Sequence, residues 1–270
     1  MKASMEGTAT VPTAGRAGLV GALAAEWTKL WTVRTSWACL ATALVLSALY
    51  PVIAGVTVRT QHAAGVEDPL LMPATAAAAS GILVVGQLAL LALATLVIAG
   101  EYGTGSIRTT LQCVPARARL LLAKALVVAP VLAVAGVVMA SFGTALAWLA
   151  MGEQAPAVTV SELVRLVAGV AGYLALAGPL VVALGAVLRS VAGTLTAALV
   201  LMLLAPMLLD QSGIAVLTTI AAALPGSAGQ VLITGGDPGP YGVAGALAVL
   251  AAWTVAAQLI AGAVMRARDG

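Results

Sequence analysis

The stretch from Glu101 to Lys124 decides how this chain is organised, and it reads Glu-Tyr-Gly-Thr-Gly-Ser-Ile-Arg-Thr-Thr-Leu-Gln-Cys-Val-Pro-Ala-Arg-Ala-Arg-Leu-Leu-Leu-Ala-Lys. It is polar and basic, yet it lies between two long apolar runs, Ser80–Gly100 and Ala125–Ala150. Apolar runs of this length cross a lipid bilayer as helices, so the stretch between them must lie in water at a membrane surface. The sequence therefore predicts a membrane protein with a short basic loop that a soluble partner can contact.

The composition of the whole chain supports this class. Of its 270 residues, 61% are apolar and only 9% are charged, whereas a soluble domain carries about 25% charged residues. Only helices and closed barrels satisfy their backbone polar groups within lipid, and continuous rather than alternating apolar runs favour helices. We therefore expect an all-α integral membrane protein.

About six spans are expected. The runs long enough to cross are Ser36–Val58, Ser80–Gly100, Ala125–Ala150, Val164–Leu188, Val191–Leu209 and Tyr241–Met265. A further apolar segment, Ile214–Leu224, is too short to cross and ends at Pro225 and Gly226, which predicts a re-entrant hairpin on the external side before the last span. The expected organisation is a disordered tail over 1–15, an interfacial helix over 16–34 and a six-span domain over 35–268.

The segment 16–34 predicts an amphipathic helix at the membrane surface. Its leucines and tryptophans fall on one face, whereas Glu26 and the neighbouring polar residues are assigned to the opposite face. Such a helix lies in the headgroup region, where tryptophan is enriched. A basic lead-in that anchors the first span explains the segment equally well. The residues assigned to this interfacial role are Trp27, Lys29, Trp31 and Arg34.

The distribution of basic residues predicts the orientation. With six spans, eleven of the thirteen Lys and Arg residues fall on the side of the N-terminus, and only Arg59 and Arg165 fall on the other. Because basic loops stay inside, both termini are expected in the cytoplasm and the chain in the cell membrane. The asymmetry explains the basic residues behind the net charge of +3 without a nucleic-acid partner.

Residues for catalysis are scarce. The chain has one histidine, His62, which argues against a zinc site. None of its three lysines follows the glycine that a phosphate-binding loop requires. We therefore expect no enzymatic activity, no metal and no cofactor in this chain.

The interiors of the expected spans hold few polar side chains. No ionisable residue is expected in mid-span, which argues against a proton-coupled carrier. The uncharged polar residues are candidates for a substrate path, and a single interhelical hydrogen bond is the alternative role for each. The three candidates are Gln87, Tyr173 and Gln258.

Four stretches, in their order and spacing, resemble a family. They are Glu26-Trp27-Thr28-Lys29-Leu30 before the first span, Glu101–Arg108 after the second, Pro115–Lys124 before the third and Leu224–Gln230 before the last. The chain is similar to type-2 ABC exporter permeases of the small six-span kind frequent in actinobacteria, and the likeness covers nearly everything after about residue 16.

The resemblance implies an ATP-driven pump that contains two permease chains, identical or different, and two ATPase chains that bind ATP and Mg²⁺. It also implies that the loop after the second span holds a cytoplasmic coupling helix. The residues in turn predict a helix over 107–113 that Thr104 or Ser106 caps and Pro115 ends. Ile107 and Leu111 would form an apolar knob for a partner. The residues assigned to this coupling loop are Glu101, Tyr102, Gly105, Ile107, Arg108, Leu111, Arg117, Arg119 and Lys124.

The expected function is the membrane permease subunit of an ABC exporter that moves a drug, antibiotic, peptide or lipid. Two alternatives stay open: a non-transporting membrane sensor or immunity protein on the same fold, and an intramembrane enzyme, which would lack a nucleophile–base pair.

Overall fold

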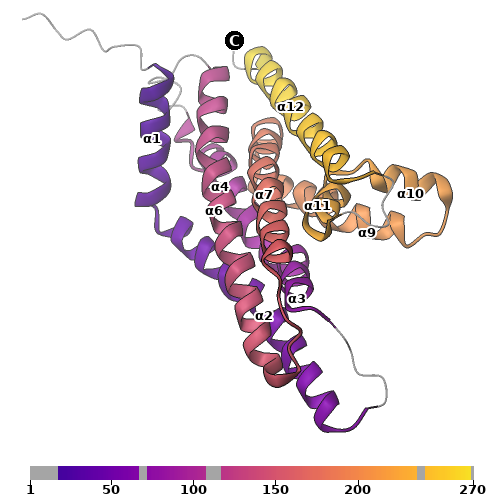
Figure 1. Ribbon diagram of the computed structural model, residues 1–270. Coiled ribbons are helices and arrows are strands. Elements are labelled where there is room, and N and C mark those ends of the chain that lie inside the picture. Colours follow the sequence, from indigo (N-terminus) through magenta and orange to yellow (C-terminus); the bar gives the residue numbers. More distant parts are fainter. Residues whose placement is uncertain (1–17, 67–71, 108–116, 236–240, 269–270) are drawn as a thin grey trace, which may run out of the picture.

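The computed structural model describes residues 18–66, 72–107, 117–235 and 241–268, and over these ranges its regular elements are all helices. Within them, six helical spans are long and apolar enough to cross a membrane (Figure 1). The spans are, in order, α2 (Arg34–Ala63); α3, η1 and α4 (Ala74–Gly81, Ile82–Gly86 and Gln87–Thr104); α6 (Arg117–Met151); α7 (Val160–Leu188); α8, η3 and α9 (Val191–Leu199, Val200–Leu204 and Ala205–Asp210); and α12 (Val243–Arg268). The prediction of an all-α protein with about six spans is confirmed.

Several spans are longer than the sequence predicted. The third, α6, has 35 residues, which corresponds to about 52 Å of helix against a hydrocarbon core of ~30 Å. It must therefore project from the hydrocarbon core. Figure 1 shows α1 (Leu19–Thr32), the start of α6 and the C-terminal end of α12 at one end of the molecule, and the end of α2 at the other.

The fourth span, α7, forms the centre of the bundle. It packs against α6, α12, α4 and α11 (Pro225–Thr234). Tyr173, Leu174, Ala177 and Leu180 on α7 are completely buried. Small residues let neighbouring helices approach, because a Cβ atom at Gly178 would lie 2.8 Å from Val128.

Apolar side chains also cover the outside of the bundle. On α2, Val45, Leu49 and Ile53 repeat every four residues and are each more than half exposed. A stripe of exposed branched side chains on a helix this apolar faces lipid rather than water. The chain is therefore a multi-pass membrane protein.

The hairpin before the last span consists of α10 (Ala215–Ala222) and α11, which are bent by 74° at the break between them. The predicted broken helix pair is thus present. Its second arm is pressed against the bundle, because a side chain at Gly229 would overlap the ring of Tyr173 and one at Gly226 would overlap the carbonyl oxygen of Met202. The second arm, α11, is therefore a packed part of the protein.

Candidate functional site: a buried charge cluster beside the basic loop

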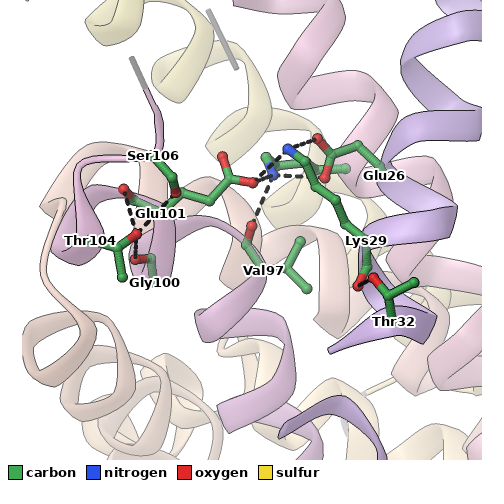
Figure 2. Close-up of polar contacts among 9 residues, drawn as sticks. Glu26, Lys29, Thr32, Val97, Gly100, Glu101, Thr104 and Ser106 are labelled. Atoms are coloured by element: carbon green, nitrogen blue, oxygen red, sulfur yellow. Dashed lines mark hydrogen bonds and ion pairs between the residues drawn. The ribbon is translucent and has the colours of Figure 1, made fainter. Parts of the chain in front are cut away.

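Four charged side chains from three elements meet where the second span ends and the third span begins (Figure 2). Glu26 and Lys29 come from α1, Glu101 from the last turn of α4, and Lys124 from α6. The Lys124 ammonium lies 2.8 Å from Glu26 Oε2 and 2.8 Å from Glu101 Oε1. The Lys29 ammonium lies 3.1 Å from Glu26 Oε1 and 3.0 Å from the same Glu101 oxygen. We call these four residues the charge cluster.

Lys124 is the centre of the charge cluster. Its side chain is 0% exposed, and Glu26 and Glu101 are 5% and 14% exposed. The third ammonium proton of Lys124 is donated to the carbonyl oxygen of Val97, 2.9 Å away. All three donors of the ammonium are therefore used, which is the condition under which a lysine tolerates complete burial.

The charges of the cluster balance, with two carboxylates and two ammonium groups. Lys29 is the one member open to solvent, at 44% exposed. Burial lowers the pKa of Lys29, but its hydrogen bond to Glu101 and the charges of Glu26 and Glu101 raise it by more, so its pKa lies above the ordinary lysine value. Lys29 is therefore charged at every physiological pH. The second carboxylate oxygen of Glu101 is buried and accepts no hydrogen bond from the described residues.

The burial of Glu26 corrects the expected faces of the interfacial helix. Ala22, Glu26 and Leu30 follow each other at intervals of four and form the buried side of α1. Glu26 thus lies on the apolar side, opposite to the prediction. The physical reason is that this side of α1 contacts α6 and the end of α4, where Lys124 supplies the charge that Glu26 needs.

The burial of Ile107 corrects a second expectation. Ile107 is 7% exposed and packs in one apolar cluster with Ala22 of α1 and with Leu120 and Ala123 of α6. The expected apolar knob at Ile107 is therefore covered within the chain, while the assignment of this loop to a partner stays a prediction. A charge at this position would disturb packing within the chain, so it would test folding before it tested docking.

Other residues of the predicted coupling loop also make contacts within the chain. Gly105 ends α4 in the left-handed conformation, with φ at 75°. The guanidinium of Arg189 lies 5.1 Å from the ring centre of Tyr102, a cation–π arrangement. Arg117 donates to the carbonyl oxygen of Met265 at 2.8 Å and thereby ties the start of α6 to α12.

The structure describes only part of the remaining coupling loop. Arg119 is exposed. Arg108 and Leu111, and the predicted helix beyond Ile107, lie outside the described residues, as does the expected tail over 1–15. Thr104 belongs to α4, and its hydroxyl donates to the carbonyl of Gly100 at 3.1 Å.

Three tryptophans gather where α1 meets α2. The ring centres of Trp27 and Trp31 are 5.6 Å apart, and those of Trp31 and Trp37 are 5.0 Å apart. Trp27 and Trp37 are about half exposed, and Arg34 begins α2 with an exposed side chain. Aromatic rings and a cation at the start of a span suit a membrane interface.

The three candidates for a substrate path form hydrogen bonds within the bundle. The hydroxyl of Tyr173 donates to Gln87 Oε1 at 2.6 Å, and both side chains are buried. Gln258 donates to the carbonyl oxygen of Pro179 at 2.8 Å. These are the interhelical bonds that the sequence left as the alternative. Gln87 also lines a cavity, which is described below.

The sequence held a signal for the cluster that our prediction missed. Glu26 is spaced by four residues from Ala22 and from Leu30, and Lys124 interrupts the apolar run from Leu120 to Ala125. An acid and a base that each stand on an apolar helix face are candidates for a buried pair. Their separation of 98 residues hides the pairing, because nothing in the local pattern connects them.

Within the described residues, no group of three or more His, Cys, Asp or Glu side chains is placed to hold a metal ion. The chain matches none of the family models and none of the curated proteins with which it was compared.

Proposed function

We propose that this chain is the membrane permease subunit of an ATP-driven ABC exporter, which moves its substrate out of the cell when a separate ATPase subunit hydrolyses ATP. ATP and Mg²⁺ would bind to that partner. Two permease chains, identical or different, would together enclose the transport path.

The charge cluster is the observation that carries this proposal. It joins α1 to the end of the second span and to the start of the third, directly beside the loop that runs from Gly105 to α6. Ile107, on that loop, packs against α1 and α6 as well. A force applied to the loop therefore acts on three elements at once and not on one flexible segment.

The polar character of the connection suits a moving joint. Glu101 receives hydrogen bonds from Lys29 and Lys124 on one oxygen. Ion pairs can exchange partners without opening an apolar core. A movement of the loop can therefore switch the charge cluster from one set of ion pairs to another. Packed cores also have discrete alternative arrangements, so a small shift at one site becomes a defined rearrangement.

The test is a reconstituted complex. The tagged chain is purified from its own host with the ATPase that binds it, and ATP hydrolysis and transport are measured in proteoliposomes. We expect a stoichiometric ATPase with a Walker A motif, and ATP-dependent movement of substrate. A chain that binds no ATPase, or a complex that hydrolyses ATP without moving any compound from a broad panel, would contradict the proposal.

A variant pair makes the test specific to the cluster. Glu101→Gln keeps the shape of the side chain and leaves the cluster with a net charge of +1. Glu153→Gln, an exposed acid at the opposite end of α6, is the matched control. We expect the Glu101→Gln complex to keep its ATPase but to lose transport-coupled hydrolysis, whereas the control behaves as the wild type.

A further inference from the structure

A cavity of about 700 Å³ lies between the second span, the fifth span and the α10–α11 hairpin. Its volume is within the range of small-molecule sites, about 300–1,000 Å³. It is well separated from the charge cluster, because Gln87, which lines it, precedes Glu101 by about 21 Å along the helix axis. The charge distribution predicts that this side of the membrane is external.

Both walls of the cavity depart from regular α-helix at the same place. Leu83 and Val84 come from the π-helical turn η1, and Met202 and Leu203 come from the π-helical turn η3. Such turns are rare within helices and occur frequently at functional sites. Two of them face one cavity here.

Tyr173 holds the two walls from behind. The hydroxyl of Tyr173 donates to Gln87, and the side-chain amide of Gln87 donates to the carbonyl of Leu83 in η1. The same Tyr173 hydroxyl lies 3.6 Å from the sulfur of Met202 in η3. The hairpin closes another side, where the hydroxyl of Tyr241 donates to the carbonyl of Ala222. Hydrogen bonds therefore link the elements that border the cavity.

The lining combines apolar walls with one negative charge. Among the described residues that line the cavity, Asp210 is the only charged side chain. The remaining polar groups are neutral hydroxyls and amides, among them Ser80, Gln87, Gln211, Ser227 and Gln230. A site with a carboxylate, neutral hydrogen-bonding groups and apolar surface favours a ligand that is both apolar and positively charged.

We propose that this cavity binds lipophilic cations, and that they are the class of compound that the exporter moves. The role as export substrate rests on the proposed function. Binding itself requires no ATPase, so a failure of binding and a failure of transport can be told apart.

The test uses two probes of matched shape and opposite charge, tetraphenylphosphonium and tetraphenylborate. Equilibrium binding of each labelled probe is measured to the purified full chain in a non-ionic detergent. Asp210→Asn removes the charge, with Glu153→Gln as the matched control. Thr219→Trp fills the cavity from α10, and the adjacent Ile220→Trp, which is 48% exposed and does not line the cavity, is its control.

We expect saturable binding of the cation and weaker binding of the anion. Asp210 is exposed, so Asp210→Asn should weaken binding of the cation by about twofold to fivefold and should not weaken binding of the anion. Thr219→Trp should abolish binding, whereas both controls retain it. Equal binding of the two probes, or an Asp210→Asn variant that binds like Glu153→Gln, would overturn the proposal. If Thr219→Trp does not fold, the charge variants and the probe pair still decide the outcome.

Discussion

At the scale of single residues, Lys124 is the side chain on which most depends. A buried ion pair contributes little net stability compared with an apolar replacement of the whole group, but removal of one partner leaves an uncompensated charge. Lys124→Met removes the ammonium and leaves Glu26 and Glu101 buried with two like charges. We expect a loss of about 3–5 kcal/mol in the free energy of unfolding, measured by denaturant or thermal unfolding in detergent.

The control for this variant is Arg266→Met, which removes an exposed basic residue near the end of α12. Its effect should stay within about 0.5 kcal/mol. Equal destabilisation by the two variants would show that the position of the charge does not matter and would contradict the role assigned to the charge cluster.

Charge balance gives a second prediction at this scale. Glu101→Gln weakens the charge-assisted bonds from Lys29 and Lys124, each of which contributes about 1.5–3 kcal/mol, and leaves one positive charge in excess. Adding Lys29→Gln restores neutrality around the remaining pair of Glu26 and Lys124. The double variant should therefore be at least as stable as Glu101→Gln alone. The single variant Lys29→Gln completes the double-mutant cycle. If the loss of stability in the double variant equals the sum of the losses in the two single variants, charge balance is not what stabilises the site.

Local sequence pattern identified the types of residue at the candidate site but not their contacts. The basic loop, the aromatic residues before the first span and the polar residues in the spans could all be recognised from local pattern. The cluster could not be placed, because Glu26, Glu101 and Lys124 come together only when α1 folds back against α4 and α6. For the same reason Ile107 could be recognised as an apolar residue in a polar loop, but not as one that packs inward.

At the scale of elements, the approach of α11 to α7 depends on glycine. A side chain at Gly169 of α7 would overlap the carbonyl oxygen of Leu232 in α11, whereas the space beside Gly172, one turn along the same helix, is open. We expect Gly169→Ala to destabilise the protein by about 1–3 kcal/mol through overpacking. Gly172→Ala should be neutral or slightly stabilising, because alanine favours a helix more than glycine does.

The measurement is thermal unfolding of the two variants in detergent, supported by protease accessibility of the hairpin. If Gly169→Ala were as stable as Gly172→Ala, α11 would not be held against α7 in the way described. The hairpin itself was predictable, because Pro225 and Gly226 interrupt an apolar run too short to cross. Its close contact with α7 was not, since glycine is abundant in this chain and its local pattern does not single out Gly169.

The ends of the helical spans were also predicted less well than their number. The six runs were found from hydropathy, but the second span begins at Ala74 and the third at Arg117, earlier than predicted. Hydropathy locates the part of a helix that lies in hydrocarbon, whereas a helix continues beyond it wherever its backbone and side chains find partners. At Arg117 that partner is the carbonyl oxygen of Met265. The π-helical turns η1 and η3 had no counterpart in the hydropathy pattern.

At the scale of the whole molecule, the two ends of the bundle differ in chemistry. The end with α1 and the start of α6 holds the charge cluster and the contacts of Arg117 and Arg189. The cavity lies on the other side of the predicted bilayer midplane and contains a single carboxylate among its described lining residues. The second span connects the two sites directly, because α4 contributes Glu101 to the cluster and Gln87 to the cavity.

The last prediction is the orientation of this molecule in the membrane. Eleven of the thirteen basic residues fall on the side of the N-terminus, and basic loops are retained in the cytoplasm. Cys39 and Cys113 are first replaced by serine, and single cysteines are introduced at three exposed positions, Val66, Ser106 and Gln211. A membrane-impermeant maleimide added to intact cells should label positions 66 and 211, and position 106 should react only after the membrane is permeabilised. Labelling of 106 but not of 66 in intact cells would invert the molecule. It would place the charge cluster outside, where no ATPase could act on it, and the proposed function would fall with it.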